Sequence, residues 1–213
     1  MKAGPLVLAA AVVLVGGFVF GDLAAAVDRG ARLGMDRQAF DVGADLRSGA
    51  MTSVMKVVTA VGSTTAIIVL LVAALAFLAD RRCWLGFAPL LAGALLTNIA
   101  WNQVKTWEAR PRPSGRLVAA SGFSFPSGHA TNSVAYVAVA VALAVCLPRL
   151  AGRAGVIVVA IVLAAAIGLS RVYLRVHYLS DVVGGWALGA ALFSICALVA
   201  LLVASVRHNV RSP

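Results

Sequence analysis

The sequence predicts an all-α protein, a polytopic transmembrane helical bundle with six spans. Hydrophobic residues make up 62% of the 213-residue chain and charged residues only 12%, and the mean hydropathy is +0.97. Soluble domains are far less apolar. A spanning helix needs about 20 mostly apolar residues, because hydrocarbon offers the backbone no hydrogen-bond partner. Six stretches qualify, at residues 4–27, 52–79, 84–104, 129–147, 155–170 and 182–206.

The first and fifth stretches need separate justification. The first resembles a secretory signal peptide, with small residues at Ala24–Ala26. The run from Leu6 to Val27 is long for a signal-peptide core, and its removal would leave an odd number of spans. We therefore expect an uncleaved first helix, with cleavage as the alternative. The short fifth stretch can be extended by residues 150–154 or 172–174. Little chain remains outside the spans, which favours one domain over residues 1–213.

The short connections predict which side of the membrane each loop faces. With six spans, loops alternate sides, and one face collects seven cations and only one acid, Asp80. The positive-inside rule places this face, and both termini, in the cytoplasm. The composition, rich in alanine, valine, glycine and arginine, is typical of a high-GC bacterial genome and so indicates a bacterial-type cell membrane. The cations are Lys2, Arg81, Arg82, Arg149, Arg153, Arg207 and Arg211. On the other face, the loop at residues 28–50 carries four arginines balanced by four aspartates and is expected to be neutral.

Two further segments on the outer face are strongly basic. Residues 105–116 and 170–181 carry six cations opposed by only Glu108 and Asp181. Lysine and arginine at helix ends can reach lipid headgroups, but that reading does not account for the two histidines among them. The cations are Lys105, Arg110, Arg112, Arg116, Arg171 and Arg175.

The same outer segments suggest what they bind. His129, His177 and Asp181 could in principle be metal ligands, but six nearby cations would repel a divalent metal and attract an anion. Arginine matches phosphate oxygens bidentately, and lysine adds a point charge. We therefore expect a phosphate ester or diphosphate, with no metal or other cofactor, and the apolar setting of the charges argues against a nucleic-acid partner.

The stretch Pro126-Ser127-Gly128-His129 precedes the fourth span. Serine is a favoured N-cap, glycine permits close approach of the backbone, and the free N–H groups of a helix start bind anions. A plain capped helix start would account for Pro126 and Ser127. It does not account for His129 in the first turn.

His177 and Asp181 are spaced i, i+4, so the carboxylate can accept a hydrogen bond from one ring N–H of His177. That bond would leave the other ring nitrogen free to attack phosphorus. We hypothesise that His177 is the nucleophile, that His129 protonates the leaving alkoxide and then activates water, and that Asp181 orients His177. The phosphoryl oxygens would be held by Lys105, Arg112, Arg171 and the N–H groups near Ser127 and Gly128.

These residues together resemble the three-part signature of the type 2 phosphatidic acid phosphatase superfamily. The matching positions are Lys105 with Arg112-Pro113, then "PSGH" at 126–129, then Ser170-Arg171 with His177 and Asp181. The six expected spans resemble the family's integral-membrane lipid phosphate phosphatases, with the motif core at residues 105–181.

The resemblance implies the same roles. His177 would be the nucleophile, His129 the general acid and Asp181 the residue that orients His177, with five residues binding phosphate: Lys105, Arg112, Ser127, Gly128 and Arg171. It also implies hydrolysis without a divalent metal. Arg110, Arg116 and Arg175 lie outside the signature; they could contact a second phosphate or headgroup, and we favour the reading that they anchor the loops.

A site at the outer ends of spans three to six sits at the lipid interface, which favours a membrane lipid-phosphate substrate. The family's bacterial members act on phosphatidic acid, phosphatidylglycerophosphate, or undecaprenyl diphosphate and its relatives. Alternatives are a soluble phosphate ester, transfer to an acceptor other than water, or a catalytically silent lipid binder or transporter.

Cys83, Cys146 and Cys196 are expected to be packing residues. Gly185 and Gly189 are expected to pack inside the bundle, and the oligomeric state is left open.

Overall fold

The computed structural model describes residues 3–31, 33–147 and 152–211, with side chains as far as Arg207. Lys2, Arg149 and the side chain of Arg211, which contribute to the predicted sidedness, lie outside these residues. So do residues 150 and 151 of the proposed extension of the fifth span.

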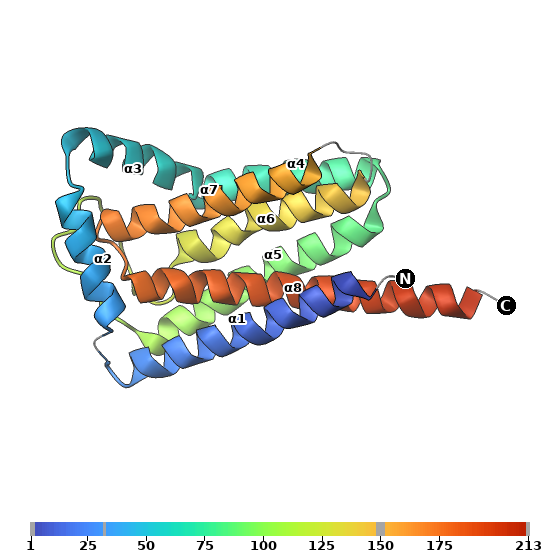
Figure 1. The fold of residues 1–213 in the computed structure, drawn as a ribbon, viewed down its shortest axis with the longest axis horizontal. Coiled ribbons are helices and arrows are strands. Elements are labelled where there is room, and N and C mark those ends of the chain that lie inside the picture. Colours follow the sequence, from blue (N-terminus) through green and yellow to red (C-terminus); the bar gives the residue numbers. More distant parts are fainter. Residues whose placement is uncertain (1–2, 32, 148–151, 212–213) are drawn as a thin grey trace.

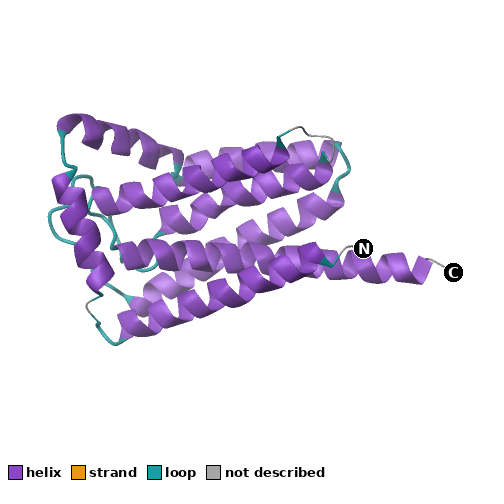
Figure 2. Ribbon diagram, viewed as in Figure 1, coloured by secondary structure: helices purple, strands orange, loops and turns teal. Residues whose placement is uncertain are grey.

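The described residues form eight helices and no strand, which confirms the all-α class (Figures 1 and 2). The helices are α1 (Gly4–Asp28), α2 (Gly34–Asp45), α3 (Gly49–Val61), α4 (Thr64–Asp80), α5 (Trp84–Glu108), α6 (Gly128–Cys146), α7 (Arg153–Tyr173) and α8 (Leu179–Arg211).

Five helices are long and apolar enough to cross a membrane, namely α1, α5, α6, α7 and α8. The pair α3 and α4 passes the same test only when the two helices are taken together, and it is bent by 44°, so the described residues hold five candidate spans, or six if this pair crosses as one. The sequence predicted one continuous helix there. The break arises because Gly62 ends α3, and the Ser63 hydroxyl accepts a hydrogen bond from the Ala66 N–H at 3.3 Å, starting a new helix.

Helix α2 was not expected, because residues 28–50 were predicted to be a loop. It lies across one end of the bundle (Figure 1). Ala39 and Phe40 pack against a buried cluster made by Ala130, Val172 and Val182. Apolar residues on one face of this short helix therefore cover the ends of α6, α7 and α8.

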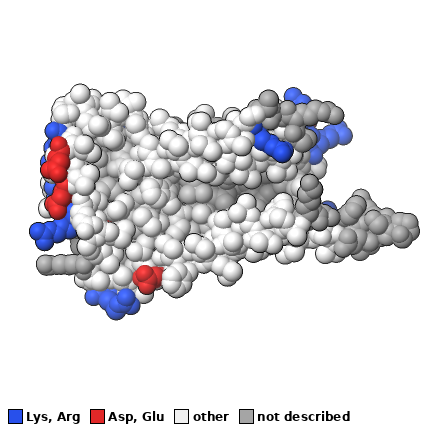
Figure 3. Space-filling model, viewed as in Figure 1, with Lys and Arg blue, Asp and Glu red and all other residues white. Residues whose placement is uncertain are grey.

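The bundle is apolar along its length and charged at its ends. Figure 3 shows lysine and arginine at both ends of the visible face and aspartate and glutamate only toward the end that carries α2, with uncharged residues between the ends. The chain termini lie at the end opposite α2 (Figure 1). The three cysteines are free, and Cys83 and Cys146 pack against the core cluster of α4, α5 and α6, as expected for packing residues.

Glycines allow α8 to lie very close to the start of α6. A methyl group on Gly185 would come within 2.8 Å of the Ser127 carbonyl oxygen, and one on Gly189 within 2.7 Å of the Thr131 carbonyl oxygen. Both distances are too short for a side chain. The prediction that these glycines pack inside the bundle is confirmed, and this contact brings the first turn of α8 against the start of α6.

Candidate active site

The fold gathers the predicted site residues at the end of the bundle covered by α2. Four helices meet there: α5 ends, α6 begins, α7 ends and α8 begins (Figure 1). Lys105 lies in the last turn of α5, Arg112 in the following loop, Ser127, Gly128 and His129 at the start of α6, Arg171 in the last turn of α7, His177 between α7 and α8, and Asp181 in the first turn of α8.

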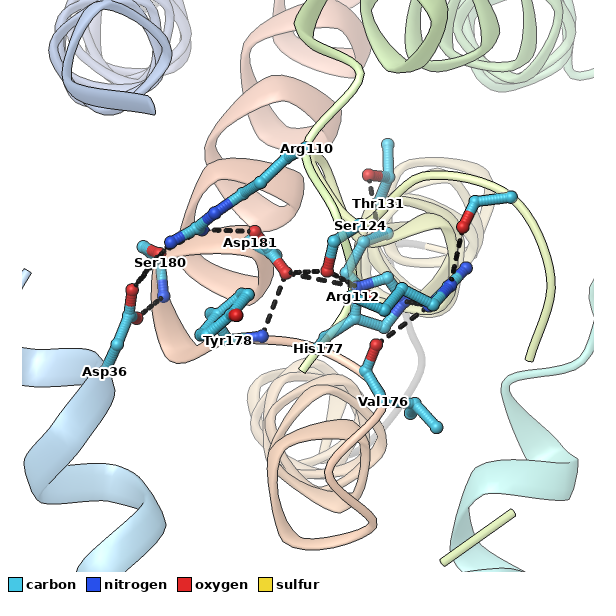
Figure 4. A network of polar contacts seen from close by, with 12 residues as sticks. Asp36, Arg110, Arg112, Ser124, Thr131, Val176, His177, Tyr178, Ser180 and Asp181 are labelled. Carbon is cyan, nitrogen blue, oxygen red and sulfur yellow. Dashed lines mark hydrogen bonds and ion pairs between the residues drawn. The ribbon is translucent and has the colours of Figure 1, made fainter. Parts of the chain in front are cut away.

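His177 is buried, with its two ring nitrogens facing groups of opposite charge. Nδ1 lies 3.4 Å from Asp181 Oδ2, and Nε2 lies 3.0 Å from Arg112 Nη1 (Figure 4). A guanidinium can only donate, so Nε2 must be the acceptor and Nδ1 carries the hydrogen. Burial lowers the pKa of the His177 imidazole to about 4, against the opposing effect of Asp181. The ring is therefore neutral near pH 7, with the lone pair on Nε2.

Asp181 is fully buried and accepts hydrogen bonds on both carboxylate oxygens. Oδ2 accepts from the Ser124 hydroxyl at 2.5 Å and from the Tyr178 N–H at 2.9 Å, besides facing His177. Oδ1 accepts from Arg110 Nη1 at 2.6 Å. Sequence reasoning missed Ser124, which belongs to no motif and reaches the carboxylate only through the folding of its loop.

Arg112 is fixed by backbone carbonyl groups. Its Nη1 donates to the Val176 oxygen at 2.8 Å, and its Nε and Nη2 donate to the Ser121 oxygen at 3.2 and 2.8 Å. These bonds hold the guanidinium beside His177 Nε2. They join the loop after α5 to the connection before α8.

Lys105 and Arg171 are the other predicted phosphate ligands. The Lys105 ammonium lies 5.1 Å from the centre of the Trp101 ring, and Arg171 Nη1 donates to Thr59 Oγ1 at 2.7 Å. Within the described residues, none of Lys105, Arg112 and Arg171 forms an ion pair with a carboxylate. The charges of the three cations act on one another, and a cluster of cations without an ion-pair partner is suited to an anion.

Ser127 is the N-cap of α6, as predicted, but its side chain makes no capping bond. The Ser127 N–H donates to the Asp181 backbone oxygen at 2.9 Å, so this N–H is already used inside the protein. The Ser127 hydroxyl is buried and has no hydrogen-bond partner in the described part of the chain. A buried hydroxyl of this kind is suited to a polar ligand.

His129 lies in the first turn of α6 and faces the break between α3 and α4. A methyl group on Gly62 would come within 3.3 Å of His129 Cδ2. Lys105, Arg112, Arg171 and His177 are all near enough for their charges to act on the imidazole. The two histidines therefore belong to one site.

The three arginines outside the signature differ in their contacts. Arg116 donates to the Ala120 oxygen at 2.9 Å, and the Arg175 guanidinium lies 4.9 Å from the centre of the Phe40 ring; both contacts hold loops, in line with the anchoring we favoured. Arg110 instead forms ion pairs with Asp36 at 3.0 Å and Asp181 at 2.6 Å. It contacts the orienting carboxylate directly.

Across residues 3–31, 33–147 and 152–207, no three histidine, cysteine, aspartate or glutamate side chains come together in a way that could hold a metal ion. The charge of the site comes from lysine and arginine side chains.

The sequence comparison identifies the family. The sequence model of the PAP2 superfamily matches residues 83–203, more than half of the chain. The chain belongs to the PAP2 superfamily. The match begins at the end of the loop before α5 and includes every predicted site residue, whereas α1 to α4 lie before it.

Two PAP2 relatives are known by function. The chain is 36% identical over 178 residues to phosphatidylglycerophosphatase B of Bacillus subtilis, which covers 80% of this chain and 86% of that protein. It is 37% identical over 134 residues to decaprenylphosphoryl-5-phosphoribose phosphatase of Mycobacterium tuberculosis, and this alignment covers 61% of this chain and 68% of that protein. Both are named phosphatases, and the predicted enzyme class, a phosphatase of the PAP2 lipid type, is confirmed.

Solved PAP2 structures share the fold. The transmembrane PAP2-type phosphatidylglycerolphosphate phosphatase from Bacillus subtilis superposes with a TM-score of 0.77 at 29% identity, over 94% of this chain and 98% of that one. LpxE from Aquifex aeolicus gives 0.62 at 21% identity, over 80% and 96%. The transmembrane neighbour from Bacillus subtilis and the apolar helices of this chain confirm a membrane protein, and LpxE supports the fold alone.

Proposed function

We propose that this PAP2 protein hydrolyses the phosphate monoester or diphosphate of a membrane lipid through a phosphohistidine on His177. The observation that carries the proposal is the state of the His177 ring. Its Nδ1 faces Asp181 and its Nε2 accepts from Arg112. When a phosphoryl oxygen accepts the Arg112 N–H in place of Nε2, the lone pair of Nε2 is free to attack phosphorus.

The reaction proceeds in two displacements. His177 Nε2 bonds to phosphorus while the bond from phosphorus to the leaving oxygen breaks, and His129 gives a proton to that oxygen. Water then attacks the phosphohistidine, His129 takes its proton, inorganic phosphate leaves and His177 is restored. His129 acts as acid in the first step and as base in the second.

The phosphoryl oxygens would be bound by Lys105, Arg112, Arg171, the Ser127 hydroxyl and the N–H of Gly128. Support comes from the three cations that lack a carboxylate partner among the described residues and from the buried, unbonded hydroxyl of Ser127. Fixed cations around phosphorus stabilise the charge of the transition state without rearrangement during the reaction. No step requires a metal or other cofactor.

A lipid substrate is supported by the position of the site and by the relatives. The site lies at one end of a bundle of apolar helices, where the headgroup of a lipid in the surrounding bilayer could enter. The relatives' names refer to phosphatidylglycerophosphate and to decaprenylphosphoryl-5-phosphoribose. Phosphatidic acid, phosphatidylglycerophosphate and polyprenyl diphosphate are the candidate substrates. We further infer one domain spanning residues 1–213 of a bacterial-type cell membrane, with cytoplasmic termini and the site on the outer face.

The test is phosphate release by the purified protein in detergent, with EDTA present. The substrates are the three lipid phosphates and, for comparison, a soluble ester such as glycerol phosphate. We expect release from at least one lipid and none in His177→Ala, whereas Arg171→Ala should raise KM by about tenfold because it loses a charge-assisted contact to phosphate. With labelled phosphate, the intact protein should carry an acid-labile, alkali-stable label after quenching, and His177→Ala should not.

Each alternative gives a different result. Substantial turnover by His177→Ala would rule out the phosphohistidine. Release from glycerol phosphate alone would contradict a lipid substrate, and label appearing on an added alcohol would indicate transfer to an acceptor other than water. No release from any substrate would favour a silent lipid binder.

A further inference from the structure

Asp36 of α2 is a buried carboxylate that reaches the start of α8 from outside the segment matched by the family. Only 5% of its surface is exposed. Its Oδ1 accepts from the Ser180 N–H at 2.7 Å, and its Oδ2 accepts from the Ser180 hydroxyl at 2.8 Å and from Arg110 Nη2 at 3.0 Å. Asp36 thus binds the residue next to Asp181 and one side of the Arg110 guanidinium.

Arg110 connects this carboxylate to the catalytic centre. Its Nη1 donates to Asp181 Oδ1 at 2.6 Å, while its Nη2 points to Asp36 (Figure 4). The guanidinium also lies 4.0 Å from the centre of the Tyr178 ring, so its plane is held as well as its ends. Such a group cannot rotate without breaking two buried ion pairs.

The two carboxylate oxygens of Asp181 have different hydrogen-bond partners. Oδ1 faces Arg110, whereas Oδ2 faces Ser124, the Tyr178 N–H and His177 Nδ1. The Arg110 bond therefore sets which oxygen is left for His177. Asp36 pairs with the other side of Arg110 and partly neutralises its positive charge. The negative charge of Asp181 is therefore less neutralised by Arg110 and acts more strongly on the His177 imidazole.

We propose that Asp36 and Arg110 are positioning residues that orient Asp181, and so set the geometry and charge felt by His177. The inference rests on the proposed role of His177 as nucleophile. It makes α2 part of the active machinery, although α2 contributes no group to the phosphate. Neither residue touches the reacting atoms.

Other charged groups face His177 and must be held constant in a test. Arg112 from the loop after α5, Arg171 from α7 and Asp181 from α8 act directly on the imidazole, and the titratable His129 of α6 lies near it. Asp36→Asn and Arg110→Gln leave all four in place. Each variant removes one charge of the link, and Asp36→Asn also keeps the size of the side chain.

The experiment measures kcat, KM and the pH dependence of kcat/KM on the lipid phosphate that the wild-type protein hydrolyses best. Both variants should lower kcat by about 10- to 100-fold, as a misplaced catalytic group does, with KM changed by less than about threefold. The acid limb of the pH profile of kcat/KM should move in opposite directions in the two variants. Losing the positive charge of Arg110 favours the imidazolium and moves the limb to higher pH, whereas losing the negative charge of Asp36 moves it to lower pH.

Three controls make the result specific. Asp41→Asn removes an exposed charge from the same helix and should leave kcat and the limb unchanged. Arg110→Lys keeps the charge but not the two-armed geometry, and should lower kcat without moving the limb. The double variant Asp36→Asn with Arg110→Gln should lose no more kcat than Arg110→Gln alone, because both changes break one link.

Wild-type kcat and an unmoved limb in Asp36→Asn would overturn the inference, as would losses that multiply in the double variant. If Asp36→Asn does not fold, normal kcat in Arg110→Lys overturns it equally. His177→Ala, assayed alongside, separates the two proposals. Turnover in that variant removes the proposed mechanism, whereas an inactive His177→Ala with a wild-type-like Asp36→Asn removes only the positioning role.

Discussion

At the scale of single residues, the chemistry of the site depends on keeping His177 neutral although a buried carboxylate lies beside it. The Nδ1 to Asp181 distance of 3.4 Å is long for a hydrogen bond, whereas Ser124 and Tyr178 bind the same oxygen more closely. Asp181 is therefore satisfied without a proton from His177. Its bond to the imidazole can shorten when positive charge develops on the ring during attack.

The neutral state of His177 gives a pH prediction. Burial lowers the pKa of its imidazole to about 4, from 6.5 for the ordinary group. Above pH 6.5 the ring is neutral in both folded and unfolded protein. Between about 6.5 and 4 only the unfolded chain takes up the proton, so the free energy of unfolding should fall as pH falls through this range.

Nitrogen NMR of histidine-labelled protein in detergent checks this directly, with His177→Gln to assign the signal. A His177 titration near 6.5 would contradict the prediction. A ring that stays neutral at pH 5 would agree with it.

Residues within the motifs could be predicted from the sequence, because their spacing places cations, a helix start and a His–Asp pair on one membrane face. The structure gathers all eight at that end. Ser124 and Asp36 could not be found in this way. Each acts through a contact made by a loop or helix whose position depends on tertiary packing, and Asp36 lies 145 residues before Asp181.

At the scale of elements, the site depends on how closely α8 approaches α6. Because Gly185 and Gly189 have no side chain, the backbone of α8 can lie directly against the backbone at the start of α6. The Ser127 N–H can then donate a hydrogen bond to the Asp181 backbone oxygen. Phe125 is fully buried, stacks on Phe20 of α1 at 5.9 Å, and lies over Gly184. The loop before α6 is thus fixed on two sides.

Gly185→Ala should therefore destabilise the protein and lower activity together. The new methyl group would lie 2.8 Å from the Ser127 oxygen and 3.1 Å from the Thr131 nitrogen, so the backbones must separate. Overpacking of this kind costs about 1–3 kcal/mol. The measurement is reversible unfolding in mixed detergent, together with kcat on the same preparation.

Gly17→Ala in α1 is the matched control, since a methyl group there meets nothing within 4 Å. It should be neutral or slightly stabilising, because alanine favours helix more than glycine does. Equal effects of the two substitutions would contradict a role for close packing at Gly185.

Helices α2 and α3 show where the sequence was insufficient at this scale. The hydropathy of residues 52–79 predicts a span but does not reveal the 44° bend at Gly62 and Ser63, because a helix stop and an N-cap inside an apolar run do not change its mean hydropathy. Helix α2 is short and polar on average, and it is stabilised by packing on α7 and α8. Length and periodicity alone could not distinguish it from a loop.

At the scale of the whole molecule, both termini lie at one end of the bundle and the site lies at the other (Figure 1). Among the described residues, Arg81, Arg82 and Arg153 lie at the end opposite the site, beside the single acid Asp80. At the site end, Arg110 is paired with Asp36 and Asp181, and Lys105, Arg112 and Arg171 are the proposed phosphate ligands. The unbalanced cations therefore favour a cytoplasmic location for the end that holds the termini.

This orientation can be tested by labelling single cysteines in intact cells. The background is a variant with Cys83, Cys146 and Cys196 changed to serine, into which a single cysteine is introduced as Arg47→Cys or Asp80→Cys. Arg47 lies in the connection between α2 and α3 at the site end, and Asp80 ends α4 at the opposite end. Both positions are exposed. A membrane-impermeant maleimide should label Arg47→Cys in intact cells, and Asp80→Cys only after the membrane is opened. The reverse pattern would place the site in the cytoplasm. Labelling of both positions in intact cells would place them on the same side of the membrane and would contradict a crossing by α3 with α4, the one span that separates them.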